Sequence, residues 1–420
     1  MSTGGPGPAR SEPASWLPVP EDSPFPMQNL PYGVFSREGD DDPPRVGVAI
    51  GDFVLDLVPV AAAESLDGGH VFAAPTLNDF LALGRPAWSA VRQRLTELLT
   101  LPGSRDAVEP HLVPRAAARL QLPFSVADYV DFYSSEHHAR NVGRIFRPDG
   151  EALPPNWRYL PIGYSGRAGT VVVSGTDVVR PCGQRRPPGS AAPSYGPSTR
   201  LDVEAEVGFV VGVGSALGLT VRADRFREHV FGLVLLNDWS ARDLQAWEYQ
   251  PLGPFLGKSF ATSISPWVVP LEALEAARVR PPAQDPEPLD YLRDEEGWGL
   301  DLRLEVRWND TVVSRPPFAA MYWTPAQQLA HLTSNGASLR TGDLYASGTV
   351  SGPDPDERGS FLELGWNGEH PVRLADGSTR SFLEDGDTVT ISATAPGRGG
   401  IRLGLGEVRG TVRPAYGPER

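Results

Sequence analysis

The stretch LDVEAEVGFVVGVG, residues 201–214, joins two closely spaced carboxylates to a nearly continuous apolar run. Such a run is typical of a strand covered on both faces, because a half-solvated strand alternates polar and apolar residues. Residues two apart in a strand point to the same side, so Glu204 and Glu206 share one face. Two interpretations stay open: a solvated strand face, which is usual for glutamates, or a buried pair that needs a cation.

Other strand-like runs surround this stretch. The chain of 420 residues contains 45 glycines and 43 prolines, which favours many short strands over long helices. The runs that follow residue 120 are GTVVVSG, GLVLLND, SPWVVPL, LDLRLEVRW, GDLYASGTVSG, DTVTISATA and IRLGLGEVRG, with helices expected at REHVF, SARDLQAWEY and TPAQQLAHLTS. We therefore expect a mainly β fold with some α-helix.

Three segments are expected along the chain. Residues 1–23 are rich in proline, glycine and serine, and are predicted to be a mostly mobile tail. Residues 24–120 contain the runs YGVFS and RVGVAIGDFVLDL and a helical stretch from Asn78 to about Thr100, which indicates a small first domain. A proline-punctuated connection places the boundary near residue 120, so residues 121–420 form a larger second domain.

Charge and cysteine content exclude several classes of protein. The formal charge of −14 and the pI near 5.0 argue against a nucleic-acid partner, because such proteins need a positive field. The one cysteine, Cys182, rules out an intrachain disulfide framework, and no signal-type or membrane-length apolar run occurs. We expect a cytoplasmic protein without a membrane partner.

Lys258 is the one lysine among 38 basic residues. It is singled out because a lysine ammonium is compact and its pKa shifts readily on burial.

The stretch DFYSSEHHAR, residues 131–140, holds two of the seven histidines. If one of its serines caps a helix, His137 shares a polar, solvent-facing stripe with Asn141. His138 instead shares the apolar stripe of Val142, which must pack inward, so a buried His138 can be oriented and tuned. The alternative is a hydrogen-bonded core histidine without a chemical role.

A further polar cluster lies in LLNDWSARDLQAWEYQPLGPFLGKSFATSISPW, residues 235–267, where an apolar strand ends in Asp238. Polar side chains recur three and four residues apart on the helix that follows, and so share a face: Arg242, Gln245 and Tyr249. Lys258 comes after a proline-glycine turn. Polar groups that converge in an aromatic, proline-rich setting favour a pocket, and an ordinary amphipathic helix is the alternative.

Glu363 ends the stretch LYASGTVSGPDPDERGSFLE, residues 344–363. It can orient a histidine as the third partner of an acid–base array, or it can lie on the surface. Common signatures are missing elsewhere: GVGSALG departs from G-x-G-x-x-G spacing, and no G-x-S-x-G elbow, P-loop or H-E-x-x-H motif occurs. The sequence therefore does not predict a nucleotide-binding protein or one of the commonest hydrolases.

Taken together, these stretches resemble the fumarylacetoacetase family. The resemblance rests on SWLPVPEDSPFPMQNLPYGVFS, DFYSSEHHARNVGRIFR, LPPNWRYLPIGYSGRAGTVVVSG, LDVEAEVGF, LNDWSARDLQAWEYQPLGPFLGKSF and ASGTVSG followed by LELGW, in that order along the chain. It implies a small SH3-like N-terminal barrel, a large mixed β-roll catalytic domain and a homodimer. It also implies hydrolysis of a carbon–carbon bond of 4-fumarylacetoacetate to fumarate and acetoacetate, the last step of tyrosine and phenylalanine degradation.

The resemblance also implies roles for residues at matching positions. His138 would be the general base, oriented by Glu363, and Lys258 and Thr262 would border a second small-cation site near Asp238. The ligands of a calcium or magnesium ion would be Asp131, Glu204, Glu206 and Asp238. The donors to a developing oxyanion would be Arg242, Gln245 and Lys258. The contacts to a small anionic diketo-acid substrate would be Tyr133, Arg147, Tyr164, Gln245, Tyr249 and Thr349.

Alternatives remain for the substrate and for two segments. Acylpyruvate hydrolases, oxaloacetate decarboxylases and hydratases use similar carboxylates, but His138 with Glu363 and the long N-terminal domain favour 4-fumarylacetoacetate. A non-catalytic metal-binding scaffold would lack the base that this sequence retains. The chain departs from the family at Ala261, where the motif has glycine. The proline-rich loop 183–199 is either a surface connector or a wall that closes over substrate.

Overall fold

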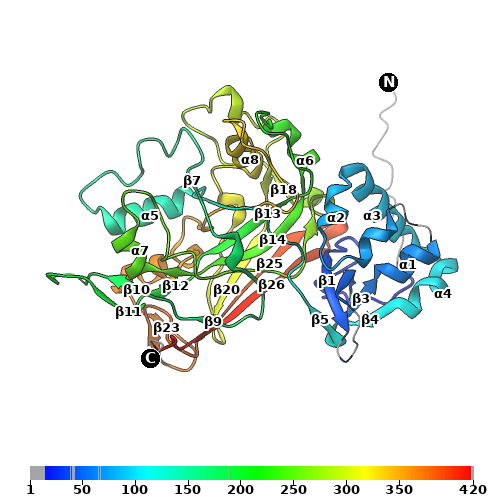
Figure 1. Ribbon diagram of the computed structural model, residues 1–420, viewed down its shortest axis with the longest axis horizontal. Coiled ribbons are helices and arrows are strands. Elements are labelled where there is room, and N and C mark those ends of the chain that lie inside the picture. Colours follow the sequence, from blue (N-terminus) through cyan, green and yellow to red (C-terminus); the bar gives the residue numbers. More distant parts are fainter. Residues whose placement is uncertain are drawn as a thin grey trace, which may run out of the picture.

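The computed structural model describes residues 15–37, 39, 43–64, 66, 68–187 and 189–417. These residues build a smaller N-terminal region and a larger region that carries the long central strands (Figure 1). The N-terminal region contains a five-stranded antiparallel sheet in the order β4-β3-β2-β1-β5. Its elements are β1 (Tyr32–Arg37), β2 (Arg45–Ile50), β3 (Phe53–Asp56), β4 (Leu112–Pro114), β5 (Ala118–Leu120), α1 (Leu57–Glu64), α2 (Asn78–Ala82), α3 (Arg85–Thr100) and α4 (Arg105–Val108).

Two predictions for this region need correction. The helix expected over residues 78–100 is split into α2 and α3 at Gly84, whose φ of +83° lies in the left-handed region that glycine favours. The mobile tail predicted for residues 1–23 is too long. Trp16 donates from Nε1 to the carbonyl of Leu98 at 2.8 Å, and Leu17 is buried beside it. Residues 15 and 16 therefore pack against α3, and residues 1–14 lie outside the described part.

A mixed eight-stranded sheet forms the centre of the larger region. Its order is β7-β6-β22-β13-β14-β16-β8, and β17 also pairs with β14. The pairs β6–β22 and β8–β16 are parallel, and the remaining pairs are antiparallel. The strands are β6 (Tyr129–Phe132), β7 (Gly163–Ser165), β8 (Val171–Val173), β13 (Ala205–Val211), β14 (Val230–Asp238), β16 (Thr262–Ile264), β17 (Val269–Pro270) and β22 (Leu344–Ala346).

A second sheet, in the order β21-β20-β25-β26-β9, packs against the central one. Its strands are β9 (Val178–Val179), β20 (Arg303–Trp308), β21 (Thr311–Ser314), β25 (Thr388–Pro396) and β26 (Arg402–Arg413). Short pairs join β10 (Cys182–Arg185) to β11 (Ser194–Pro197), β12 (Leu201–Asp202) to β15 (Ser240–Ala241), β18 (Arg278–Val279) to β19 (Gly299–Leu300) and β23 (Val372–Arg373) to β24 (Thr379–Arg380). The helices are α5 (Glu136–Phe146), α6 (Phe226–His229), α7 (Arg242–Glu248), α8 (Pro325–Thr333) and α9 (Phe361–Leu364). No helix in the described ranges has both the length and the apolar character needed to cross a bilayer.

Strand β13 is buried along its whole length, as LDVEAEVGFVVGVG predicts. Phe209 packs into the core between the two sheets, whereas Val210 packs into a second core shared with the N-terminal region. In that second core Phe231 of β14 makes an edge-to-face contact with Trp88 of α3, with 5.2 Å between ring centroids. Each such side chain stabilises the fold by about 1.5–3 kcal/mol on burial. The predicted fold, a small β unit followed by a large mixed β unit, is confirmed.

The loop 183–199 forms a hairpin rather than an irregular connection. Strands β10 and β11 pair with Gln184 opposite Tyr195. The hairpin packs on α7, where the indole of Trp247 donates to the side chain of Gln184 at 3.3 Å. Its described residues do not line the cavity of about 640 Å³ in the larger region, which favours a surface connector over a wall that closes over substrate.

Candidate active site

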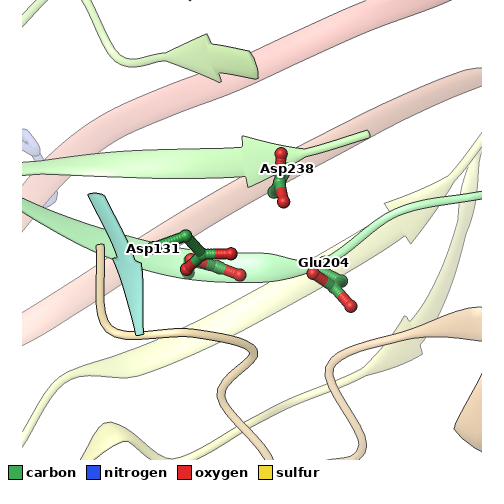
Figure 2. Close-up of side chains that lie close together, drawn as sticks. Asp131, Glu204 and Asp238 are labelled. Atoms are coloured by element: carbon green, nitrogen blue, oxygen red, sulfur yellow. The ribbon is translucent and has the colours of Figure 1, made fainter. Parts of the chain in front are cut away.

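Four buried carboxylates meet near the ends of strands in the central sheet (Figure 2). Asp131 lies on β6, Glu206 lies on β13 with Glu204 just before that strand, and Asp238 ends β14. Each offers one oxygen, and these oxygens all lie within 4.8 Å of one another. The interpretation of the two glutamates as a solvated strand face is therefore wrong, because both are buried.

The strand register brings these side chains together. Asp131 pairs with Ala346, which in turn pairs with Gly208, so small residues fill the space between Asp131 and β13 on that face. Glu206 lies on the same face as Asp238 across the β13–β14 pair. Residues that are directly opposite or two apart share a face of a sheet. The cluster thus follows from the pairing of segments that are distant in sequence.

Two of the four carboxylates are unsatisfied within the described part of the chain. Oδ1 of Asp131 and both oxygens of Glu206 are buried and accept no hydrogen bond. Burial and the neighbouring negative charges raise the pKa of both groups well above the ordinary range. Unpaired buried carboxylates are costly, and an acidic, oxygen-rich site of this kind fits a hard divalent cation. The residues present can therefore hold a metal ion.

Two cationic side chains neutralise the other side of the cluster. The Lys258 ammonium donates to Glu204 and, at 2.7 Å, to Asp238. The Arg242 guanidinium donates from Nη2 to Glu204 at 2.8 Å. Burial opposes the ionisation of Glu204, but these two cations outweigh it and hold the pKa of that carboxyl far below its usual range. Thr262 also donates to Asp238, at 3.2 Å.

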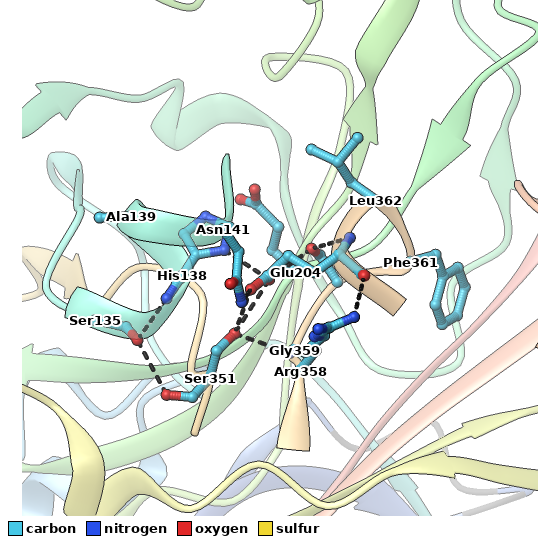
Figure 3. A network of polar contacts seen from close by, with 12 residues as sticks. Ser135, His138, Ala139, Asn141, Glu204, Ser351, Arg358, Gly359, Phe361 and Leu362 are labelled. Atoms are coloured by element: carbon cyan, nitrogen blue, oxygen red, sulfur yellow. Dashed lines mark hydrogen bonds and ion pairs between the residues drawn. The ribbon is translucent and has the colours of Figure 1, made fainter. Parts of the chain in front are cut away.

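A second polar group surrounds His138 (Figure 3). Ser135 caps α5 by accepting from the backbone N–H of His138 at 3.2 Å, which fixes the start of the helix. Nδ1 of His138 lies 2.6 Å from Oε2 of Glu363, a buried carboxylate on α9. With an ionised Glu363 as acceptor, Nδ1 carries the proton and Nε2 keeps the free lone pair.

Glu363 is well supplied with hydrogen-bond donors. Asn141 donates to Oε1 at 2.9 Å, Ser360 donates to Oε2 at 2.8 Å, and Ser351 lies 3.1 Å from both oxygens. Burial by itself would raise the pKa of Glu363, but its electrostatic interaction with His138 and the hydrogen bonds lower it. Glu363 therefore stays ionised and can select one tautomer of His138.

The face assignments along α5 are right for His138 and wrong for two of its neighbours. His138 is buried, as predicted, and His137 is half-buried. Asn141, expected on a solvent-facing stripe, instead contacts Glu363. Val142, expected to pack inward, is half-buried and lines a cavity. This helix face is apolar because it forms the wall of a cavity rather than part of the core.

The cavity has a volume of about 640 Å³ and reaches both polar groups. The predicted site residues that line it are Asp131, Tyr133, His138, Arg147, Tyr164, Glu204, Arg242, Gln245, Tyr249, Lys258 and Thr349. Glu206, Asp238, Thr262 and Glu363 do not line it, and contact residues of the site from behind. All the predicted site residues therefore belong either to the cavity wall or to the groups directly behind it.

The wall that carries Thr349 depends on a glycine. Gly348 has a φ of +76°, and a Cβ on it would lie 2.1 Å from the carbonyl oxygen of Phe132. The loop can thus approach β6 closely, and it exposes Thr349 to the cavity. Ala261, where the family motif has glycine, packs in the core between the two sheets.

Sequence reasoning missed four polar residues that hold this site: Asn141, Asp202, Ser351 and Ser360. Three of them carried a local signal. Asn141 follows His138 by three residues on one helix, and Ser360 precedes Glu363 by three at a helix start. Asp202 precedes Glu204 by two in strand-like sequence, a spacing that predicts a shared face. Ser351 carried none, because it reaches Glu363 only through the fold of its loop.

Two family models match consecutive parts of the chain. The model described as "Fumarylacetoacetase N-terminal" matches residues 28–123. The model described as "Fumarylacetoacetate (FAA) hydrolase C-terminal" matches residues 128–413. A solved structure with the same fold, a fumarylacetoacetate hydrolase from Exiguobacterium antarcticum, aligns with a TM-score of 0.54 at 17% identity and covers 92% of this chain and 100% of its own.

Curated relatives align over almost the entire chain. The fumarylacetoacetase of Homo sapiens is 48% identical over 423 residues, which span 96% of this chain and 100% of the human one. That of Arabidopsis thaliana is 48% identical over 417 residues, which span 96% of this chain and 98% of the plant one. At this identity and coverage, the chain belongs to the fumarylacetoacetase family.

Proposed function

We propose that this chain is a fumarylacetoacetase, which hydrolyses a carbon–carbon bond of 4-fumarylacetoacetate to give fumarate and acetoacetate. One observation carries the proposal: a single cavity is lined both by the His138 of a buried His–Glu pair and by carboxylates that fit a divalent cation. The cleavage needs an activated water, a place for negative charge on the attacked carbonyl and a stabilised leaving carbanion. The two polar groups supply complementary parts of this chemistry.

His138 is the general base of the proposed reaction. Its Nε2 takes a proton from water, while Nδ1–H donates to Glu363, whose charge stabilises the imidazolium that forms. The hydroxide adds to the carbonyl carbon, and the carbon–carbon bond then breaks with its electron pair on the leaving fragment. The proton on Nε2 passes to that carbanion, which returns His138 to its neutral form.

Arg242, Gln245 and Lys258 are the proposed donors to the oxyanion. Arg242 is held between two carboxylates, and its Nη1 donates to the side-chain oxygen of Gln245 at 3.2 Å, which orients that amide. Donors fixed in place before the reaction stabilise developing charge without reorganisation. A bound divalent cation would act as a Lewis acid toward the oxygens of the 1,3-dicarbonyl group.

The proposed substrate is a small anionic diketo acid. Arg147 is exposed at the cavity and is a cationic partner for a carboxylate. The Thr349 hydroxyl is buried and accepts no hydrogen bond within the described chain, which leaves it for a ligand. The aromatic contacts proposed for the substrate are Tyr133, Tyr164 and Tyr249.

We propose calcium or magnesium as the cation, held by Asp131, Glu204, Glu206 and Asp238. Hard oxygen ligands support this choice. Lys258 and Thr262 are proposed to border a second cation near Asp238, which both of them contact. Reconstitution of chelator-treated protein with each ion, followed by calorimetric titration, tests both proposals.

Product analysis tests the activity. Metal-loaded protein is incubated separately with 4-fumarylacetoacetate, an acylpyruvate and oxaloacetate. Equal amounts of fumarate and acetoacetate are expected from the first substrate, with the highest kcat/KM. Faster turnover of oxaloacetate, with carbon dioxide as product, would reject the proposal in favour of a related decarboxylase.

We also propose that each chain is divided into two domains near residue 120, and that the protein works in the cytoplasm. We propose further that two chains form a homodimer. Exposed apolar side chains between residues 247 and 256 support a partner subunit, because a second copy would remove them from water: Trp247, Tyr249, Leu252, Phe255 and Leu256. Light scattering of the purified protein tests the dimer, and fractionation of cells tests the location.

A further inference from the structure

Asp202 is a buried carboxylate whose two oxygens are both fully used. Oδ1 accepts from the backbone N–H groups of Val203 and Phe361, each at 2.8 Å. Oδ2 accepts from Nε of Arg242 at 2.8 Å and from the backbone N–H of Leu362 at 3.1 Å. Asp202 has no exposed surface and does not line the cavity, so it reaches substrate only through other residues.

These hydrogen bonds join the two polar groups of the site. On one side Asp202 holds Arg242, whose Nη2 in turn donates to Glu204 of the carboxylate cluster. On the other side it accepts from the backbone N–H groups of Phe361 and Leu362, the first two residues of α9, and Glu363 follows them directly. Backbone pairing supports the same connection, because Glu204 forms an isolated β-bridge with Ser360.

A second contact, between Phe361 and Trp308, also holds the turn of α9. The ring of Phe361 stacks on Trp308 with centroids 4.0 Å apart and planes 9° from parallel. That apolar contact fixes how far α9 stands from the core. The Asp202 carboxylate then fixes the rotation of the turn, because it receives two successive N–H groups at the helix start.

We propose that Asp202 is a positioning residue that couples the two halves of the active site. One carboxylate holds the Arg242 guanidinium toward the cavity and aims Glu363 at His138. An asparagine at this position would turn an N–H2 group toward two of the four donors and would remove the charge that opposes Arg242. The catalytic effect of this coupling rests on the proposed function, whereas the hydrogen bonds of Asp202 do not.

The test compares Asp202→Asn with Asp56→Asn in the full chain loaded with metal. Asp56 is a matched control, because it is equally buried and accepts from Arg45 and from a backbone N–H, yet it lies in the N-terminal sheet. We expect kcat of Asp202→Asn to fall by about tenfold to a hundredfold with little change in KM, as for outer groups that orient a catalytic residue. Asp56→Asn is expected to lose thermal stability while its kcat changes less than about twofold.

A spectroscopic measurement separates positioning from a general loss of stability. The proton between His138 Nδ1 and Glu363 is expected to give a far-downfield proton resonance, since that contact is 2.6 Å long. The resonance should shift or broaden in Asp202→Asn and stay unchanged in Asp56→Asn. A kcat within about twofold of wild type together with an unshifted resonance would overturn the proposal. If wild-type protein does not turn over 4-fumarylacetoacetate, the proposed function fails, and the resonance still decides the role of Asp202.

If Asp202→Asn does not fold, the variant Arg242→Lys tests the same positioning role of Asp202. Arg242 contacts Asp202 and Glu204 through two different nitrogens of its planar guanidinium, which a lysine lacks, so the coupling should weaken although a positive charge remains. Faster hydrogen exchange of the Phe361 and Leu362 amides supports the proposal, and exchange at the wild-type rate overturns it.

Discussion

Two buried carboxylates near one cavity, Glu206 and Glu363, have opposite surroundings in the protein. Glu206 lies among three other acidic groups, accepts no hydrogen bond within the described chain, and has a raised pKa. Glu363 faces His138 and receives hydrogen bonds from Asn141 and Ser360, and its pKa is lowered. Burial opposes ionisation of both groups, so their surroundings alone decide the difference.

This contrast shows which part of the site is complete and which part needs something from outside. A carboxylate with internal donors is fixed in its geometry and can orient another side chain. A carboxylate without donors is costly until a cation arrives. We therefore expect changes near Glu363 to reduce turnover, and changes near Glu206 to alter metal binding and the stability of the metal-free protein.

The largest effect is expected from His138→Ala. Loss of the proposed general base should lower kcat by about a thousandfold or more, because His138 is the group proposed to take the proton from water. Steady-state kinetics with metal-loaded protein measures this loss. The control is His137→Ala, which should keep kcat within about threefold, since His137 does not line the cavity. Equal losses in the two variants would contradict the proposed role of His138.

The next largest effect is expected on cation binding by the four-carboxylate cluster. Glu206→Gln should weaken divalent-cation binding by about tenfold or more, because it removes one charged ligand. In chelator-treated protein the same change should raise the thermal midpoint above that of wild type, since it relieves repulsion among buried carboxylates. Calorimetric titration and thermal unfolding with and without metal measure both outcomes.

Glu363→Gln is the matched control for that experiment. It should keep the cation affinity, and it should lower the thermal midpoint both with and without metal, because Glu363 already has its partners in the protein. A Glu206→Gln protein that is destabilised without metal and binds the cation normally would remove the distinction between the two carboxylates.

A smaller effect is expected from Asn141→Ala. The substitution removes one donor from Glu363 while His138 stays in place, so kcat should fall by about tenfold with little change in KM. Loss of this donor also removes one cause of the low pKa of Glu363, so the pKa should rise. Arg144→Ala, an exposed change on the same helix, is the control and should leave kcat unchanged. Equal kcat values in the two variants would contradict the orienting role of Asn141.

The smallest expected effect is a pH dependence of stability. The pKa of Glu363 is lower in the folded protein than its ordinary value of 4.5, so its ionised form stabilises the fold. This contribution is fully present above the ordinary value and is lost as the pH falls through the lower folded value. Denaturant unfolding of wild type and Glu363→Gln should therefore give a free-energy difference that is constant near neutral pH and shrinks in acid. A difference that grows in acid would contradict the sign of the shift.

Much of this fold was predictable because its strands have strong local patterns. The apolar runs predicted β13 and β14, and the serines of DFYSSEHHAR indicated a helix start, which the structure places with Ser135 as the cap. Errors came where local pattern and surroundings disagree. The proline-rich start of the chain gave no sign that Trp16 packs on α3. The solvent-facing position predicted for Asn141 is wrong, because helical spacing does not show whether a face contacts water, the core or a carboxylate from another segment.

The amino-acid sequence by itself determined the strand pattern and the residue types of the site. It placed two glutamates on one strand face and put His138 on the buried side of a helix, since both follow from local periodicity. Tertiary structure alone decided the state of each carboxylate. Glu206 meets acidic groups from other strands, whereas Glu363 meets donors from α5 and from the loop at Ser351. Charge and hydrogen-bond supply depend on distance in space, so residues of the same type acquire opposite properties in one fold.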